Sequence, residues 1–479
     1  MAAPLPGRCG FFVEKKKRFC KMIVGKGKIF CGEHATMEEG SSSSSSSRRR
    51  IICPLDPKHT VSEDKLDKHL KKCNSRQKDK PVYYVENINS GSADGDETQQ
   101  VSLSERSRVE LQSLLNKLKA AVTGLQSDVE DRVLSHPSLQ EELSNPKNGD
   151  SAHKHLKQQS SILGHLGELG LLGRGRCFVE FGAGRGKLSH WIHEALKTRE
   201  DLKTREDLKT CEDLQLLLVE RSSTRFKVDG KHQDDGVQFE RLQVDIQHLD
   251  LSKVPLLRQK KLPLVGVGKH LCGAATDLAL RCLLETPAIR EETEPPPKRL
   301  KTSKPAADPS PDDPGPASDP NDPEPASDPG PGCGPVLGLV VALCCHHRCD
   351  WRHYVGQHFF LQRGLGAAEF SAFCRMSSWA TCGLRPNNQD RPPQDPTNQS
   401  GEEEEHEAAE ETDAVNGFLS AGEREQVGRL CKRLIDGGRL HFLRTKGFDS
   451  KLTQYVDARV TLENVLLTAV PRSKSSTSS

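Results

Sequence analysis

The chain has 479 residues, of which only 34% are hydrophobic and 5% aromatic. That length excludes a single ordinary core, and the low apolar content indicates that part of the chain is solvated linker. The net charge of +2 is small but unevenly distributed.

Residues 1–80 carry the positive charge. Nineteen Lys and Arg residues stand there against nine Asp and Glu residues, a net charge of +10. A small unit with this balance favours a polyanionic partner, most simply nucleic acid. The alternative is a generic surface excess or a localisation signal.

The sequence shows neither a secretion signal nor a membrane span. Lys15 to Arg18 interrupt the N-terminal segment where a signal peptide would need an apolar core. The longest apolar run, Leu337 to Cys345, falls far short of the roughly 20 residues of a membrane helix. We therefore expect a soluble intracellular protein, in the nucleus, the cytoplasm or both, whose 16 cysteines are metal ligands or active-site groups.

Two groups of cysteine and histidine in the basic segment have the spacing of zinc ligands. In residues 50–77 the pattern C-x5-H-x9-H-x3-C comprises Cys53, His59, His69 and Cys73. His69 and Cys73 share one face of an expected helix, and a proline-stiffened loop brings the other two, which predicts a closed tetrahedral site. In residues 1–40 a wider pattern, C-x10-C-x10-C-x2-H, predicts a second zinc finger from Cys9, Cys20, Cys31 and His34.

A helical linker is expected over residues 100–145. Apolar residues recur there at steps of three and four between Ser102 and Leu125, and Ser102 with Glu105 resembles a capping box. Packing on neighbouring elements is favoured over a dimerising coiled coil.

Residues 150–470 alternate short apolar runs with helical segments, which predicts an α/β domain with a Rossmann-like parallel sheet covered on both faces. Strands are expected at 177–181, 214–220, 237–245, 262–268, 336–343 and 461–470, and helices at 152–169 and 423–435, the latter ending at Gly437 and Gly438. Residues 286–335, with fifteen prolines, and the Pro-rich and acidic residues 386–415 are expected to be disordered inserts.

A glycine turn after the first strand of this domain predicts a nucleotide-cofactor site. Phe178 to Lys187 read Phe-Val-Glu-Phe-Gly-Ala-Gly-Arg-Gly-Lys, in which the glycines Gly182, Gly184 and Gly186 allow close approach of a ligand to the backbone. A dinucleotide fold would need glycine where Lys187 stands. Glu180 with G-x-G-x-G is instead typical of S-adenosylmethionine-dependent methyltransferases.

Acids at the ends of the next two strands support this interpretation. Glu220 can accept both hydroxyls of a ribose, and Asp245 is placed to accept from an adenine amino group. Each acid alone is more simply a solvated side chain at a strand end. Glu180, Glu220 and Asp245 at three successive strand ends beside the glycine turn together favour the cofactor.

The fourth and fifth strands lead into two reactive clusters, Lys269 to Gly273 (Lys-His-Leu-Cys-Gly) and Cys344 to Cys349 (Cys-Cys-His-His-Arg-Cys). A metal site is not expected in the second cluster, because adjacent residues point in alternating directions and no zinc-like pair is present. We expect His346 or His347 to orient or deprotonate a ribose hydroxyl while Lys269 and Arg348 steady a nearby phosphate. Packing of small residues is the alternative for the cysteines.

The combination of these motifs resembles one family. Two fingers of CCCH and CHHC type, the run Ile-Leu-Gly-His-Leu-Gly-Glu-Leu-Gly-Leu-Leu, the glycine turn, Lys-His-Leu-Cys-Gly and Cys-Cys-His-His resemble eukaryotic tRNA 2′-O-methyltransferases that modify the fourth nucleotide of the acceptor stem. The resemblance covers about 8–76 and most of 150–470. It implies S-adenosyl-L-methionine and zinc as cofactors and the tRNA acceptor stem, not DNA or a membrane, as partner. It further implies 2′-O-methylation of cytidine or adenosine in tRNAs such as those for glycine, proline and histidine.

Two alternatives stay open. One is a methyltransferase of another substrate. The other is an RNA-binding zinc-finger protein, of the kind found in splicing, with a non-catalytic methyltransferase domain. Intact glycines and acids argue against the second, and the basic fingers argue against a small-molecule substrate.

Overall fold

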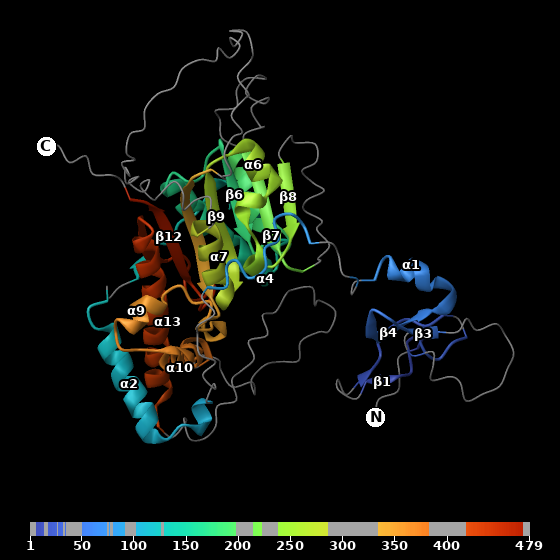
Figure 1. Cartoon of the computed structure of the whole chain (residues 1–479), viewed down its shortest axis with the longest axis horizontal. Helices are drawn as coiled ribbons and strands as arrows, with labels where there is room; N and C mark the ends of the chain where they lie inside the picture. Colours follow the sequence, from blue (N-terminus) through green and yellow to red (C-terminus); the bar gives the residue numbers. More distant parts are fainter. Residues whose placement is uncertain are drawn as a thin grey trace, which may run out of the picture. The chain divides into compact units, whose positions relative to one another are not determined.

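The computed structural model describes residues 6–13, 18–25, 27–31, 34, 50–73, 76, 80–91, 102–125, 129–197, 214–222, 238–285, 334–382 and 418–472. It forms two compact units, Met1–Pro81 and Val82–Ser479 (Figure 1). Both expected disordered inserts, apart from Gly334 and Pro335, lie outside the described residues. None of the described helices has both the length and the apolar character that crossing a membrane requires.

The first unit has almost no apolar core. Its described elements are two small antiparallel sheets and short helical turns: β1 (Phe12–Val13), β2 (Arg18–Phe19), β3 (Arg50–Cys53), β4 (Asp56–Ser62), η3 (Glu63–Lys65) and α1 (Leu66–Leu70). Among its described residues, the buried apolar side chains are Val61 and the four cysteines Cys9, Cys31, Cys53 and Cys73. A chain with so little apolar surface to bury needs another source of folding energy, which metal ligation can supply.

The second unit is built on one mixed sheet of eight strands, in the order β5-β11-β12-β10-β9-β6-β7-β8. Strands β8, β7, β6, β9 and β10 are parallel, and β12 runs antiparallel to both of its neighbours. The bounds are β5 (Glu130–Asp131), β6 (Arg176–Phe181), β7 (Leu214–Glu220), β8 (Gln238–Gln243), β9 (Leu264–Cys272), β10 (Val336–Cys344), β11 (Phe448–Gln454) and β12 (Val465–Pro471). The expected α/β class and the parallel core of the sheet are confirmed.

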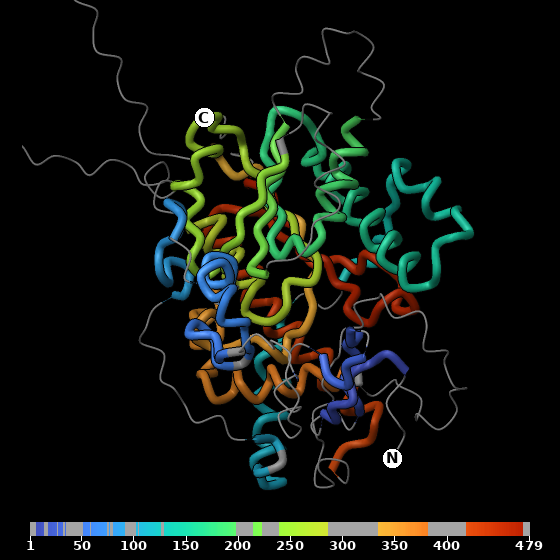
Figure 2. Tube along the Cα trace, turned by 90° about the vertical axis from the view of Figure 1, so that its right-hand side faces the viewer, coloured from blue at the N-terminus to red at the C-terminus, as the bar shows by residue number. Residues whose placement is uncertain are grey.

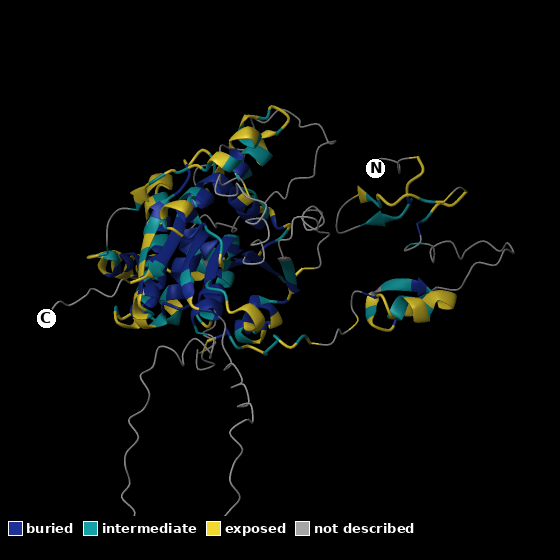
Figure 3. Cartoon of the chain, turned by 90° about the horizontal axis from the view of Figure 1, so that it is seen from above, coloured by how far each residue is buried: buried dark blue, intermediate teal, exposed yellow. Residues whose placement is uncertain are grey.

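Helices cover both faces of this sheet. Side chains along a strand alternate between faces, so Phe178 packs with α4 (Asp150–Glu168) and α5 (Lys187–Lys197). Val179 packs on the opposite face with α6 (Pro255–Lys260), α7 (Ala274–Leu284) and α13 (Ala421–Thr445). Figure 3 shows the buried residues concentrated in the sheet and on the inner sides of these helices. The short helical elements of this unit are η4 (Leu103–Glu105), η5 (Pro137–Leu139), α3 (Gln140–Ser144), η8 (Ile246–His248), η9 (Leu251–Lys253), η10 (His346–Arg348), α9 (Gln357–Leu361) and α11 (Trp379–Cys382).

The segment expected as a helical linker belongs to a third core. Helix α2 (Arg108–Val122) packs its buried leucines with α10 (Ala367–Ser377) and α13, and Figures 1 and 2 show α2 in cyan beside the orange and red segments. The Ser102–Glu105 capping box is present but opens only η4. A second box, Ser107 with Glu110, opens α2 itself.

Helix α13 corrects one boundary. It was expected to end at Gly437 and Gly438 but continues to Thr445. A Cβ atom at Gly438 would lie 2.0 Å from the hydroxyl oxygen of Tyr354, so glycine is needed there for close packing and not for a helix end. The glycine with left-handed backbone comes later, at Gly447 (φ 83°). Strand β11, Phe-Asp-Ser-Lys-Leu-Thr-Gln, was missed because it has no apolar run.

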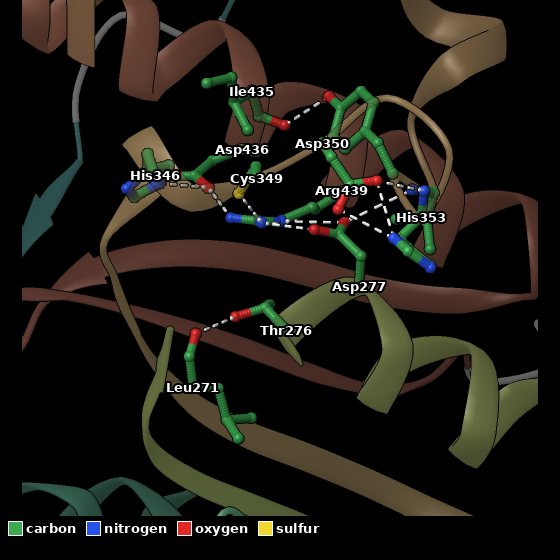
Figure 4. Close-up of polar contacts among 12 residues, drawn as sticks. Leu271, Thr276, Asp277, His346, Cys349, Asp350, His353, Ile435, Asp436 and Arg439 are labelled. Carbon is green, nitrogen blue, oxygen red and sulfur yellow. Dashed lines mark hydrogen bonds and ion pairs between the residues drawn. The ribbon is translucent and has the colours of Figure 1, made fainter. Parts of the chain in front are cut away.

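A buried ionic network ties α13 to the loop after β10 and to α7 (Figure 4). Arg439 donates through Nη2 and Nε to the two oxygens of Asp277, at 2.6 and 3.2 Å, and through Nη1 to Asp436 at 2.9 Å. Asp436 also lies 2.9 Å from Nε2 of His346. The side chains of Arg439, Asp277 and Asp436 are at most 3% exposed. Burial alone would raise the pKa of Asp436, but His346 and Arg439 hold it below its ordinary value.

Replacing Arg439 with Met should destabilise the second unit by about 3–5 kcal/mol, because removing one partner of a buried ion pair leaves the others uncompensated. Arg429→Met is the matched control on the same helix: Arg429 pairs with Glu425 and its side chain is 68% exposed, so the expected loss is under about 1 kcal/mol. All three tryptophans, Trp191, Trp351 and Trp379, lie in this unit. Urea unfolding followed by their fluorescence therefore measures both losses, and equal midpoints for the two variants would contradict the role of Arg439.

Candidate active site and metal centres

The glycine turn has the geometry that its sequence predicts. Strand β6 ends at Phe181, and Gly182 and Gly184 then adopt positive φ angles of 61° and 49° before α5 begins. L-residues with side chains rarely adopt these angles. A Cβ atom at Gly182 would also lie 2.9 Å from Leu271 of the neighbouring strand. The turn thus brings bare backbone to the carboxyl end of the sheet.

Glu180 is buried directly beneath this turn. Its carboxylate accepts hydrogen bonds from the backbone nitrogen of Ser189, at 2.9 Å, and from the Ser189 hydroxyl. Burial raises the pKa of Glu180 to about 7, against the lowering effects of Ser189, Arg241 and Lys269. Glu180 therefore fixes the start of α5 and is a carboxyl group that titrates near neutral pH.

Glu220 and Asp245 follow the next two strands, as expected. Glu220 accepts from the backbone nitrogen of Gly184 at 3.0 Å and from that of Ser222 at 2.8 Å, so it contacts the glycine turn from β7. Asp245 lies just after β8, where it caps η8 by accepting from the Gln247 nitrogen, and pairs with Arg221 at 3.4 Å.

A cavity of about 520 Å³ opens beside the turn. Glu180, Gly182, Gly184 and Lys187 line one side, Gly149 to Ala152 at the start of α4 line another, and Lys269 and His270 at the end of β9 close it. Glu220 and Asp245 are not among the lining residues of this cavity. The cavity lies where the strand order reverses between β6 and β9, the usual ligand position in such sheets.

Sequence reasoning missed His155 and the first turn of α4. His155 lines the cavity, and its Nδ1 lies 2.9 Å from Nζ of Lys269. These two residues are 114 positions apart in the chain. The available signal was the number of polar residues in this helix, since α4 buries Gln158, Gln159 and His165 among its leucines.

His346, expected to act on a ribose hydroxyl, lies away from this cavity. Its side chain is 2% exposed, its Nε2 is bonded to Asp436, and it does not line the cavity (Figure 4). His347 follows in η10 and is not a lining residue either. His346 therefore holds the loop after β10 to α13, whereas Lys269 is the member of the expected set that the structure brings to the cavity.

The CHHC ligands form a compact group of donor atoms. Sγ of Cys53 lies 3.2 Å from Nε2 of His69 and 3.8 Å from Sγ of Cys73, and Nε2 of His59 lies 3.1 Å from that of His69. Zinc bonds of about 2.0–2.3 Å in a tetrahedron give donor separations of about 3.3–3.8 Å. The donor set fits zinc, and Asp56, 3.5 Å from Nδ1 of His59, can orient that ligand.

The CCCH ligands are grouped in the same way. Nδ1 of His34 lies 3.4 Å from Sγ of Cys9 and 3.3 Å from Sγ of Cys31. The donor atoms of Cys9, Cys20, Cys31 and His34 all lie within 4.8 Å of one another. Although the CCCH residues are widely spaced in the sequence, the structure brings all four predicted ligands together.

Comparison with known proteins identifies three matching family models. Residues 157–470 match the family "Methyltransferase TRM13", residues 7–35 match "CCCH zinc finger in TRM13 protein", and residues 50–74 match "U11-48K-like CHHC zinc finger". No solved structure matches the chain.

Relatives match over nearly the whole chain. Proteins of Mus musculus and Homo sapiens named "tRNA:m(4)X modification enzyme TRM13 homolog" are each 52% identical over 99% of this chain and 96% of their own length. A Yarrowia lipolytica protein named "tRNA:m(4)X modification enzyme TRM13" is 31% identical over 96% of this chain and 89% of its own length. With its methyltransferase region and both fingers matched in order, the chain belongs to the TRM13 methyltransferase family.

Proposed function

We propose that this chain transfers a methyl group from S-adenosylmethionine to the ribose 2′-hydroxyl of cytidine or adenosine at the fourth position of the tRNA acceptor stem, in tRNAs such as those for glycine, proline and histidine. The cavity between the glycine turn, the start of α4 and Lys269 is the single observation that carries the proposal. Membership of the family supports methyl transfer, and the names of the relatives support tRNA as the substrate class.

A Rossmann-like cofactor fold is part of this proposal. Counted from β6, the five parallel strands have the order 3-2-1-4-5 of doubly wound nucleotide-binding sheets. The antiparallel β12 then lies between β10 and β11. The order reverses at β6, the strand that ends in the glycine turn.

S-adenosylmethionine, when bound, supplies a methyl group made electrophilic by a sulfonium. Glu220 would accept the ribose hydroxyls of the cofactor, Asp245 would accept from the adenine amino group, and the glycine turn would face its methionine part. Glu180 provides negative charge beneath the turn once it is ionised.

Lys269 and His155 act on the acceptor hydroxyl, which must lose its proton when oxygen takes the methyl group. In the neutral form of Lys269, Nζ would donate one hydrogen to Nδ1 of His155 and keep a lone pair that could take the hydroxyl proton. The released proton then passes to solvent. Nδ1 of His155 also fixes the position of Nζ, so His155 positions Lys269 within the cavity.

Zinc in both fingers completes the proposal. It would organise residues 1–40 and 50–77, where the basic side chains that suit RNA phosphates are concentrated. Binding of the tRNA then depends on the first unit, and methyl transfer on the second.

Radiolabelled S-adenosylmethionine and an unmodified tRNA-His transcript test the reaction. Label should enter the RNA as one alkali-resistant dinucleotide containing nucleotide 4. A transcript with a single 2′-deoxy substitution at nucleotide 4 should accept no label, while the same substitution at nucleotide 3 is the matched control and should leave transfer intact. Label on a base or on protein, or transfer to the deoxy-4 transcript, would refute ribose methylation.

Cofactor affinity should rise with pH up to about 7 and then level off. Burial raises the pKa of Glu180 to about 7, so the carboxyl is neutral below that pH, and a cationic ligand favours its ionised form. Binding then releases a proton, and affinity gains up to about tenfold per pH unit. Calorimetry at pH 6, 7 and 8 measures this. Glu180→Gln, titrated with the same ligand, should remove the dependence; an unchanged slope would exclude Glu180 as its source.

Lys269→Met should lower kcat by about 10²–10⁴-fold, the usual contribution of a positioned proton acceptor. His155→Ala should also lower kcat, and His155→Asn, which keeps an acceptor near Nδ1, should restore part of it. His153→Ala is the control on the same helix, because His153 contacts the Leu143 carbonyl and does not line the cavity. Single-turnover kinetics over pH 6–9 measure these effects. Equal rates for Lys269→Met and the unaltered chain would remove the assignment.

A further inference from the structure

A third group of cysteines lies at the rim of the large sheet, outside both fingers. Cys272 ends β9, Cys344 ends the neighbouring β10, and Cys345 follows it. Cys272 and Cys344 are paired in the parallel register of the two strands, and their Sγ atoms are 3.7 Å apart. The three Sγ atoms all lie within 4.8 Å of one another.

This spacing matches that of thiolates around one cation. A tetrahedral zinc site with bonds of about 2.3 Å separates two sulfurs by about 3.8 Å. The CHHC finger gives an internal comparison, since Cys53 and Cys73 are 3.8 Å apart there. A disulfide would instead need a separation of about 2.05 Å.

The backbone explains how two adjacent cysteines reach the same point. Successive residues of a strand point to opposite faces, which argued against a metal at this position. Cys345, however, has a left-handed backbone with φ 51°, and the strand pairing is irregular between Ala342 and Leu343. The left-handed turn ends the alternation, so Cys345 joins Cys344 and does not oppose it. A non-glycine residue in this region is strained and is typical of functional sites.

The nearest acid is already engaged. Glu463 accepts from the backbone nitrogen of Cys345 at 3.4 Å through one oxygen and pairs with Lys432 at 2.6 Å through the other. Within the part of the chain that the structure describes, the group contains Cys272, Cys344 and Cys345 and no fourth Cys, His, Asp or Glu. Three protein ligands leave one position for water or another small ligand, as in zinc sites with an open coordination position.

We propose that Cys272, Cys344 and Cys345 bind one thiophilic divalent cation, zinc foremost, at the carboxyl ends of β9 and β10. Binding replaces the three thiol protons, which pass to solvent, with three sulfur–metal bonds. The ion ties together two strands whose pairing would otherwise fray where they leave the sheet. Lys269 and His270 lie on the same strand end, so the ion also fixes the wall of the cavity.

Metal content of the purified full-length chain tests the proposal. Cys272→Ser and Cys344→Ser should each contain one metal ion per chain fewer than the unaltered protein, by inductively coupled plasma mass spectrometry. Cys53→Ser is the positive control and should also lose one ion. Cys282→Ser is the matched negative control and should lose none, since its buried thiol contacts the Leu249 carbonyl and belongs to no such group. Unchanged metal content in both cluster variants would overturn the proposal.

Alkylation of the unaltered chain gives an independent measurement if a serine variant fails to fold. Cys272 is only partly buried, so a free thiol there should react readily with iodoacetamide. Peptide mass spectrometry should find Cys272 protected until a chelator removes metal, and then labelled. Labelling without a chelator, or a disulfide between Cys272 and Cys344, would contradict a metal centre.

Discussion

The position of the loops that follow β9 and β10 depends on one buried cation, the guanidinium of Arg439. Arg439 neutralises Asp277 at the start of α7 and Asp436 on its own helix, and Asp436 in turn holds His346 after β10. Without the positive charge of Arg439, burial of either carboxylate in an apolar interior would be strongly unfavourable. Through this network α13, which comes last among the helices, sets where the loops after β9 and β10 leave the sheet.

The close approach of the Gly182 and Gly268 backbone to the side chain of Leu271 is the second constraint on the carboxyl end of the sheet. Leu271 is 1% exposed and packs between two glycines. A Cβ atom on Gly182 would lie 2.9 Å from the Leu271 side chain, and a Cβ atom on Gly268 would lie 2.7 Å from it. The neighbouring His270 has φ 62°, which turns the chain so that Leu271 points inward. The glycine turn and the Lys269–Cys272 segment are therefore packed as one piece, and a change in either moves the cavity wall.

Features that depend on local spacing could be predicted from the sequence. The bounds of β7 were predicted without error, and the eight predicted finger ligands lie in two compact groups, because strand period and ligand spacing are properties of neighbouring residues. The α/β class followed from alternation alone. The polar strand β11 has no such signal, and its pairing with β12 is set by tertiary context.

Features that depend on distant contacts were missed or misread. His155 meets Lys269 across 114 residues, and Gly438 is fixed by Tyr354 from another element, so neither could be read from its neighbours. The contact of His346 with Asp436 could not be read from the sequence for the same reason, since Asp436 lies 90 residues away. The left-handed backbone of Cys345, which ends the alternation of a regular strand, could not be read from the sequence either.

The cluster also bears on selectivity for oxygen. A thiolate is a strong nucleophile, whereas a thiol is a weak one, and Cys272 lies two residues beyond His270 in the cavity wall. Contact with Cys272 raises the pKa of Cys344 well above its ordinary value, so without metal this thiol stays protonated. The protonated Cys344 thiol is therefore a weaker nucleophile toward a methyl donor than a thiolate would be.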